Sequence, residues 1–252
     1  MREIVRQRWV EYTDPLEGTV PYPYTDSIGL VTIWRGNLVD VPLDAPPDPR
    51  HLVALPLRRL DGSPATDAEK AEAYYALRKN REAAVHGHLY ARQLAPNRLR
   101  ITREDGERLE QARLDANEAI LKQTFPGFDE MHACTQLCLH SLAWAMGPYF
   151  ARKFPKFTAH VLAGNLAEYH HDKDGRLVID DGAAAESDIS PAKGTVVERN
   201  RRQRMLLVNA TKRGPKDRID WLGELPDAAE PATPPVDRPA HVLELPTKDT
   251  TK

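Results

Sequence analysis

The segment from Glu17 to Asn37 reads Glu-Gly-Thr-Val-Pro-Tyr-Pro-Tyr-Thr-Asp-Ser-Ile-Gly-Leu-Val-Thr-Ile-Trp-Arg-Gly-Asn, and it decides the fold around it. It begins where a short amphipathic helix over residues 2–17 should end. We expect Asp14-Pro15 to interrupt that helix, because a residue before proline disfavours the helical region. Alternating tyrosines, a turn at residues 26–29 and a β-branched run predict a β-hairpin over residues 22–40. The acids Glu17 and Asp26 then lie at element edges, which predicts a cleft between them.

Cleavage of a glycosidic bond needs two carboxyl groups, one as proton donor and one as base or nucleophile. The pattern Glu-Gly…Tyr-x-Asp-x-x-Gly-x-x-Thr-Ile-x-x-Gly over residues 17–36 closely resembles the catalytic segment of phage-type, endolysin-like lysozymes, which are peptidoglycan muramidases. In that family the Glu, Asp and Thr form the catalytic triad. The resemblance therefore implies that Glu17 is the general acid, that Asp26 orients water or stabilises the oxocarbenium charge, and that Thr32 holds the water.

The resemblance extends over residues 5–210, where further motifs follow in the family's order: Ile101-Thr102, Ala143-Trp144-Ala145-Met146-Gly147, Phe154-Pro155-Lys156-Phe157-Thr158 and Asn200-Arg201-Arg202-Gln203-Arg204-Met205. It implies a lysozyme-like α+β fold that is mostly helical, with a small β-hairpin lobe and a helical lobe around a central buried helix. The commoner family pattern reads Thr-Ile-Gly-x-Gly-His, and this chain has Trp34 and Asn37 in place of that Gly and that His. We expect Tyr24, Trp34 and Asn37 to contact the substrate.

The rest of the chain divides by helical periodicity and by composition. Apolar spacing and capping residues predict further helices at 66–94, 102–125, about 129–147, 154–169 and 195–210. The helix at 129–147 is apolar nearly all round, which indicates a buried central helix. The polar residues 172–194 are predicted to form a loop.

We predict one catalytic domain over residues 1–212. Much of the Pro-rich segment 41–95 is an insertion relative to the smallest family members, and we expect it to add packing or a wall of the cleft. Residues 213–252 are Pro-rich and charged, with too few apolar residues to form a core, so they are predicted to be a mobile tail that Trp221-Leu222 tethers at its start.

The net charge, the cysteines and the histidines bear on whether the protein binds nucleic acid or a metal. The 252 residues carry a formal net charge of −2, so binding to nucleic acid through bulk charge is not expected. We interpret the basic run from Arg199 to Arg204 as a solvated helix face. Cys134 and Cys138 lie one helical turn apart in an apolar run and are predicted to be buried thiols. His170-His171 lacks a third ligand at suitable spacing, and we expect no metal and no cofactor.

The N-terminal residues Met1–Arg8 are charged and contain no apolar core of a signal peptide. We therefore expect synthesis in the cytoplasm, no stable membrane insertion, and action on peptidoglycan in the periplasm or cell wall after delivery. A holin would deliver a phage endolysin, and a secretion system would deliver an antibacterial effector. The expected partners are bacterial peptidoglycan and, for an effector, an immunity protein or the delivery machinery.

Two alternatives to a muramidase remain at this point. A lytic transglycosylase shares the fold and needs only the glutamate, although Asp26 and Thr32 in register count against it. A non-catalytic protein that binds cell wall or a partner on the same scaffold would explain the departures at Trp34 and Asn37. The sequence leaves the stereochemical outcome of cleavage open, because that depends on the separation of the two carboxyl groups.

Overall fold

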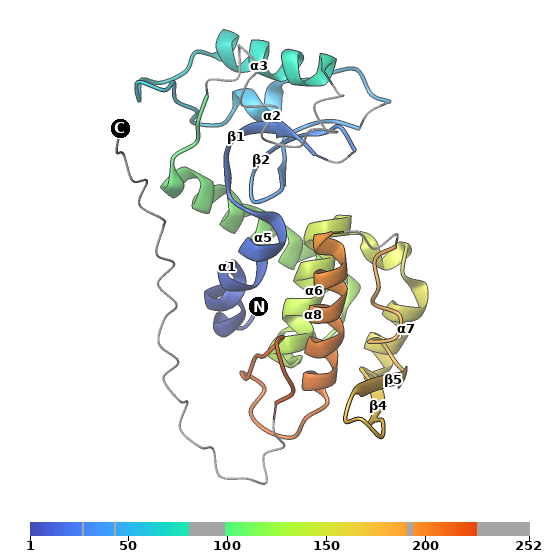
Figure 1. Ribbon diagram of the computed structural model, residues 1–252. Coiled ribbons are helices and arrows are strands. Elements are labelled where there is room, and N and C mark those ends of the chain that lie inside the picture. The colour runs from blue at the N-terminus through green and yellow to red at the C-terminus, as the bar shows by residue number, and fades with distance from the viewer. Residues whose placement is uncertain (27, 43, 81–98, 191–193, 226–252) are drawn as a thin grey trace, which may run out of the picture.

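A computed structural model of the chain describes residues 1–26, 28–42, 44–80, 99–190 and 194–225. Helices predominate in it, and a small antiparallel sheet with strand order β1-β2-β3 accompanies them (Figure 1). The predicted α+β class is thus confirmed. In chain order the elements are α1 (Glu3–Glu17), β1 (Val20–Thr25), β2 (Val31–Trp34), β3 (Asn37–Leu38), α2 (Arg50–Val53), α3 (Asp67–Lys79), α5 (Arg103–Thr124), the 3₁₀ turn η2 (Phe128–Glu130), α6 (Ala133–Met146), the 3₁₀ turn η3 (Phe150–Arg152), α7 (Pro155–Ala163), β4 (Glu168–His171), β5 (Leu177–Asp181) and α8 (Thr195–Ala210).

The described chain has two hydrophobic cores, which define two lobes. The small lobe packs the β1–β3 sheet against α2 and α3, with Ile33, Leu52 and Tyr74 in its core. The large lobe gathers α1, α6, α7 and α8 around the second core. Helix α5 links them, because Leu109 packs against the first core whereas Leu121 belongs to the second. Figure 1 shows α5 running from the small lobe towards α6.

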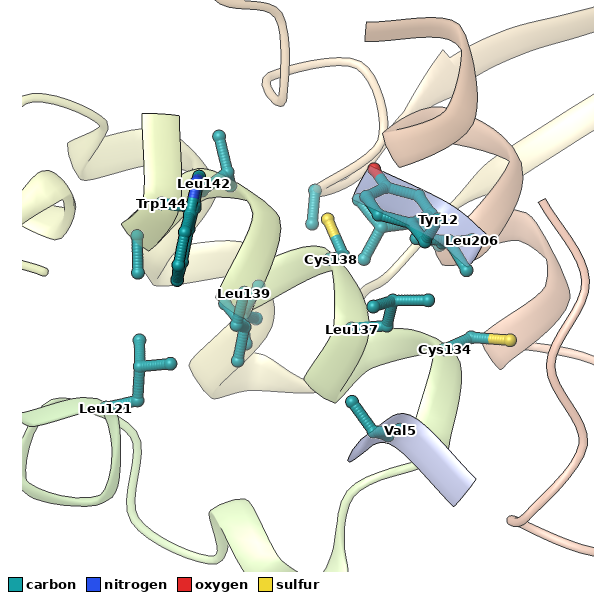
Figure 2. Close-up of a cluster of buried hydrophobic side chains, with 14 of the residues drawn as sticks. Val5, Tyr12, Leu121, Cys134, Leu137, Cys138, Leu139, Leu142, Trp144 and Leu206 are labelled. Carbon is teal, nitrogen blue, oxygen red and sulfur yellow. The ribbon is translucent and has the colours of Figure 1, made fainter. Parts of the chain in front are cut away.

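Helix α6 is the centre of the large lobe. Every residue from Ala133 to Trp144 is buried, as the all-round apolar pattern predicts. Side chains from α1, α5 and α8 surround it, among them Tyr12, Leu121 and Leu206 (Figure 2). Cys134 and Cys138 are free, buried thiols on this helix, as the sequence predicts.

The Glu17–Asn37 segment begins at the last residue of α1 and ends at the first residue of β3. The helix runs through Pro15 to Glu17, so the predicted interruption at Asp14-Pro15 is wrong. Proline in the last turn removes few helical bonds, and the Gly18 N–H closes the helix on the Asp14 carbonyl at 2.8 Å. The turn after β1 forms as predicted, with the Gly29 N–H on the Asp26 carbonyl at 3.0 Å.

Helices α2 and α3, from the Pro-rich segment 41–95, pack in the small lobe. Helix α3 begins at a capping box, in which the Thr66 hydroxyl accepts from the Glu69 N–H and the Glu69 carboxylate accepts from the Thr66 N–H. It ends at Lys79, short of the predicted Leu94, and residues 81–98 lie outside the described residues. Ala73, Tyr74 and Leu77 of α3 belong to the small-lobe core.

The region after α6 differs from the sequence prediction. Helix α7 ends at Ala163, where Gly164 adopts the left-handed conformation (φ 75°) that commonly closes a helix. Residues 168–181 then form the antiparallel hairpin β4–β5. The predicted continuation of the helix to Tyr169 and the predicted loop over 172–194 are therefore wrong in this stretch.

The first part of the predicted tail is packed. Trp221 is 3% exposed, and its ring meets the Tyr12 ring edge-on at 5.2 Å. The Asn209 side chain of α8 donates to the carbonyls of Asp220 and Gly223 and accepts from the Leu225 N–H at 2.7 Å. Residues 213–225 are thus held against the large lobe, and residues 226–252 lie outside the described residues.

None of the helices in the described ranges combines the length and the apolar character needed to cross a lipid bilayer.

Candidate functional site

A cleft of about 470 Å³ lies where the hairpin meets the large lobe. Its lining comes from the end of α1, from β1 and β2, from α5, from the end of α6 and from the start of α8. Four of the residues selected from the sequence line it together: Glu17, Tyr24, Asp26 and Thr32. Helix α1 and the hairpin therefore bring both acids to one cavity.

Glu17 is the last residue of α1, and its side chain is partly buried. Its carboxylate accepts from the guanidinium of Arg199 on α8 in an ion pair. On its other side lies Gly36, where an added Cβ would come within 2.9 Å of Glu17 Oε2. Gly36 also has φ 68°, so both space and backbone conformation favour glycine beside this carboxylate.

Arg113 of α5 and Trp144 of α6 complete this side of the cleft. The Arg113 guanidinium lies 4.0 Å from the centre of the Trp144 ring, donates to the Trp144 carbonyl at 2.8 Å and donates to the Gly36 carbonyl. Burial lowers the pKa of Arg113 to about 10, and the Glu17 carboxylate opposes that shift. Arg113 therefore remains a cation at neutral pH and fixes the backbone next to Glu17.

Asp26 follows β1 directly. Its Oδ1 accepts from the backbone N–H of Ile28 at 3.0 Å and of Leu30 at 2.9 Å. Burial raises the pKa of the Asp26 carboxyl above its ordinary value, although these backbone donors oppose the shift. The pKa of Tyr24 is raised by burial and by the Glu17 and Asp26 charges, so its phenol stays protonated and can donate a hydrogen bond.

Thr32 stands opposite Tyr24 in the antiparallel β1–β2 pair. Its side chain is buried at the edge of the cleft, and its hydroxyl donates to the Leu30 carbonyl at 3.3 Å. That long contact leaves the lone pairs of the hydroxyl oxygen available to a second hydrogen-bond donor.

Trp34 and Asn37, which we expect from the sequence to contact substrate, are not among the described residues that line the cleft. Trp34 has φ 61°, and its buried ring lies against α5, where a Cβ at Gly106 would come within 2.4 Å of the ring. Asn37 is 2% exposed, and its amide atoms have no hydrogen-bond partner within the described part of the chain. Both side chains are therefore buried away from the cleft lining in the described structure.

Two arginines that line the cleft, Arg113 and Arg199, were not singled out from the sequence. Arg199 and Arg202 are buried, so the interpretation of residues 199–204 as a wholly solvated face is wrong. A signal exists in the spacing, because Arg199, Gln203 and Leu206 recur at i, i+4 and i+7 and therefore share a helix face. Arg113, by contrast, has no sequence signal that separates it from the other charges of α5.

No protein-family model matches this chain, and a search of curated proteins finds no significant match. The resemblance to phage-type lysozymes therefore remains a prediction that rests on the pattern over residues 17–36 and on the further motifs within residues 5–210.

Proposed function

We propose that this protein is a peptidoglycan hydrolase that cleaves the glycan between N-acetylmuramic acid and N-acetylglucosamine. The observation that carries the proposal is that Glu17 and Asp26 line one cleft together with Thr32. A pair of carboxyl groups facing one cavity is the arrangement that glycosidic cleavage requires. The cell-wall setting, as a phage endolysin or as a delivered antibacterial effector, is part of the same proposal.

In this proposal the protonated form of Glu17, and not the carboxylate that pairs with Arg199, gives its proton to the glycosidic oxygen as the bond breaks. Asp26 takes a proton from the attacking water, and its raised pKa strengthens it as a base. Thr32 accepts a hydrogen bond from that water and orients it. The new bond joins the water oxygen to the anomeric carbon, so the products carry a free reducing end.

The test is cleavage of purified peptidoglycan by dye release, with product masses as a second readout. Glu17→Gln keeps the size of the side chain and removes the proton, and we expect activity to fall at least about 100-fold. Glu11→Gln is the matched control, because Glu11 is an exposed acid of the same helix, and it should leave activity unchanged. Near-normal cleavage by Glu17→Gln would sink the proposal.

Two other outcomes identify the alternatives. Products with anhydro sugars in place of free reducing ends would assign the protein as a lytic transglycosylase. Sedimentation with purified cell wall without any cleavage would assign it as a non-catalytic binding protein.

A further inference from the structure

Glu110 of α5 is a buried carboxylate that the proposed reaction does not use. Its side chain is 1% exposed and accepts three hydrogen bonds. The donors are Trp9 Nε1 at 2.8 Å, Trp34 Nε1 at 3.3 Å and Arg35 Nη1 at 2.5 Å. Trp9 belongs to α1, Trp34 is the last residue of β2, and Arg35 lies in the turn that follows. Glu110 thus joins three segments at one point.

The turn that Glu110 holds leads directly to Glu17. The Arg35 carbonyl accepts from Trp144 Nε1 at 3.0 Å. The next residue, Gly36, lies against the Glu17 carboxylate and accepts from Arg113. A displacement of the Arg35–Gly36 peptide would therefore move the wall against which Glu17 rests.

The backbone at Trp34 has an unfavourable conformation that contacts with neighbouring side chains stabilise. Trp34 is the only non-glycine residue among the described positions with a positive φ, at 61°, and side chains disfavour that region. Its ring is held by the Glu110 hydrogen bond and by close packing on Gly106. Arg35 is further fixed by Asp14, whose Oδ1 lies 3.1 Å from Arg35 Nε.

We propose that Glu110 is a positioning residue for Glu17, acting through Trp34 and Arg35 on the Arg35–Gly36 peptide. A carboxylate suits this task because it is purely an acceptor with two oxygens, whereas an amide presents one acceptor and an opposing donor. The role in catalysis rests on the proposed function of the cleft, but the structural part of the proposal does not.

The first test is the kinetics of Glu110→Gln on soluble glycan strands of peptidoglycan. We expect kcat to fall about 10- to 100-fold, because a small misplacement of a catalytic group has that effect, while KM stays within about threefold. Glu118→Gln is the matched control. Glu118 is also a carboxylate of α5 in ion pairs, with the N-terminus, Arg6 and Lys122, but within the described part of the chain none of its ion pairs reaches the turn. An equal loss of kcat in both variants would overturn the proposal.

The second test does not depend on activity. The Trp144 indole N–H does not touch Glu110, but it donates to the carbonyl of the peptide that Glu110 is proposed to position. In Glu110→Gln we expect its hydrogen exchange, followed by NMR, to accelerate at least about tenfold. The Trp221 indole N–H should exchange at its wild-type rate. Unchanged Trp144 exchange would overturn the proposal even if kcat falls.

Trp34→Phe provides a milder variant if Glu110→Gln does not fold, because it removes one donor and keeps a ring over Gly106. Trp144 exchange should again accelerate, by less than in Glu110→Gln, and unchanged exchange would count against the proposal. If the wild-type protein does not cleave peptidoglycan, the proposed function fails, and Trp144 exchange still decides whether Glu110 positions the turn.

Discussion

Burial raises the pKa of the Asp26 carboxyl, so the fold disfavours its ionisation. Its folded-state pKa is raised, so between pH 3.8 and that raised value the folded protein binds the proton more strongly than the unfolded chain. Ionisation therefore lowers the free energy of unfolding as pH rises through this window, and the loss is complete above the raised pKa.

We predict that Asp26→Asn is more stable than the wild type at neutral pH and inactive on peptidoglycan. Both backbone bonds end on Oδ1, so the amide oxygen can keep them. Thermal unfolding should show a gain in Tm at neutral pH that disappears below pH 3.8. A variant that is less stable than the wild type at neutral pH would contradict this account.

His140 is buried in the large-lobe core with both ring nitrogens unpartnered among the described residues. Its ring contacts the rings of Trp9 and Phe128 edge-on. Burial lowers the pKa of His140 to about 3, from 6.5 in an exposed histidine. Between pH 6.5 and about 3, His140 therefore binds a proton in the unfolded chain but not in the folded protein. The free energy of unfolding falls as pH falls through this window.

We predict that His140→Leu flattens the acid side of the stability profile. The wild type should lose up to about 1.4 kcal/mol of unfolding free energy per pH unit relative to the variant in that window. Urea denaturation across the window measures the difference, and exposed His51→Gln is the control. Parallel profiles for the wild type and His140→Leu would show that His140 is not the group responsible.

Single side chains show what local sequence can and cannot predict. Glu17, Asp26 and Thr32 were selected because their spacing is local to one segment, and the structure brings them to one cleft. From the sequence we expect Trp34 to contact substrate. Its ring instead lies against α5, and the positive φ of Trp34 that accompanies this placement has no signal in the sequence spacing. Arg199 pairs with Glu17 across the whole chain, and only tertiary packing creates that contact.

Helix α5 and the turn after β2 are fitted to each other at Gly106. An added Cβ there would come within 2.4 Å of the Trp34 ring. We predict that Gly106→Ala lowers the unfolding free energy by about 1–3 kcal/mol, the usual effect of overpacking. In a Trp34→Gly background the same change should instead stabilise by about 1 kcal/mol, because alanine is the better helix former.

A double-mutant cycle measured by urea denaturation tests this reversal of sign. The same sign in both backgrounds would mean that Gly106 is not needed to accommodate the Trp34 ring. The two residues would then be independent.

Elements with local signals were predicted well. The caps at Thr66 and Thr102 start helices where expected, and α8 spans residues 195–210 as predicted, because capping and helical periodicity depend on neighbours in the sequence. The hairpin β4–β5 was missed because its strands are half exposed and lack a clear alternation. Its formation depends on α7 ending at Gly164.

Residues 213–225 tie the end of the described chain to its beginning. Trp221 packs on Tyr12, and the Arg8 guanidinium lies 4.9 Å from the centre of its ring. We predict that Trp221→Ala lowers the unfolding free energy by about 3–5 kcal/mol, as for other buried aromatic truncations.

Truncations extend this prediction to the segment. Ending the chain after Lys212 should destabilise the protein at least as much as Trp221→Ala, whereas ending it after Leu225 keeps these contacts and should leave the Tm nearly unchanged. Equal Tm values for the two truncated chains would show that residues 213–225 contribute nothing to stability.

The alkylation rates of the two buried thiols of α6 report how often the structure around each of them opens. Burial raises the pKa of both, that of Cys134 to about 12, so neither thiol reacts with a maleimide until structure moves away from it. The Cys134 Sγ lies 3.4 Å from the Arg218 carbonyl, under the segment 213–225, whereas Cys138 lies one helical turn further along α6 in the large-lobe core. Local unfolding of residues 213–225 should expose Cys134 alone, whereas exposure of Cys138 should require unfolding of the large lobe. Alkylation in excess maleimide should therefore modify Cys134 before Cys138. The ratio of the two alkylation rates should measure how far residues 213–225 unfold independently of the large lobe.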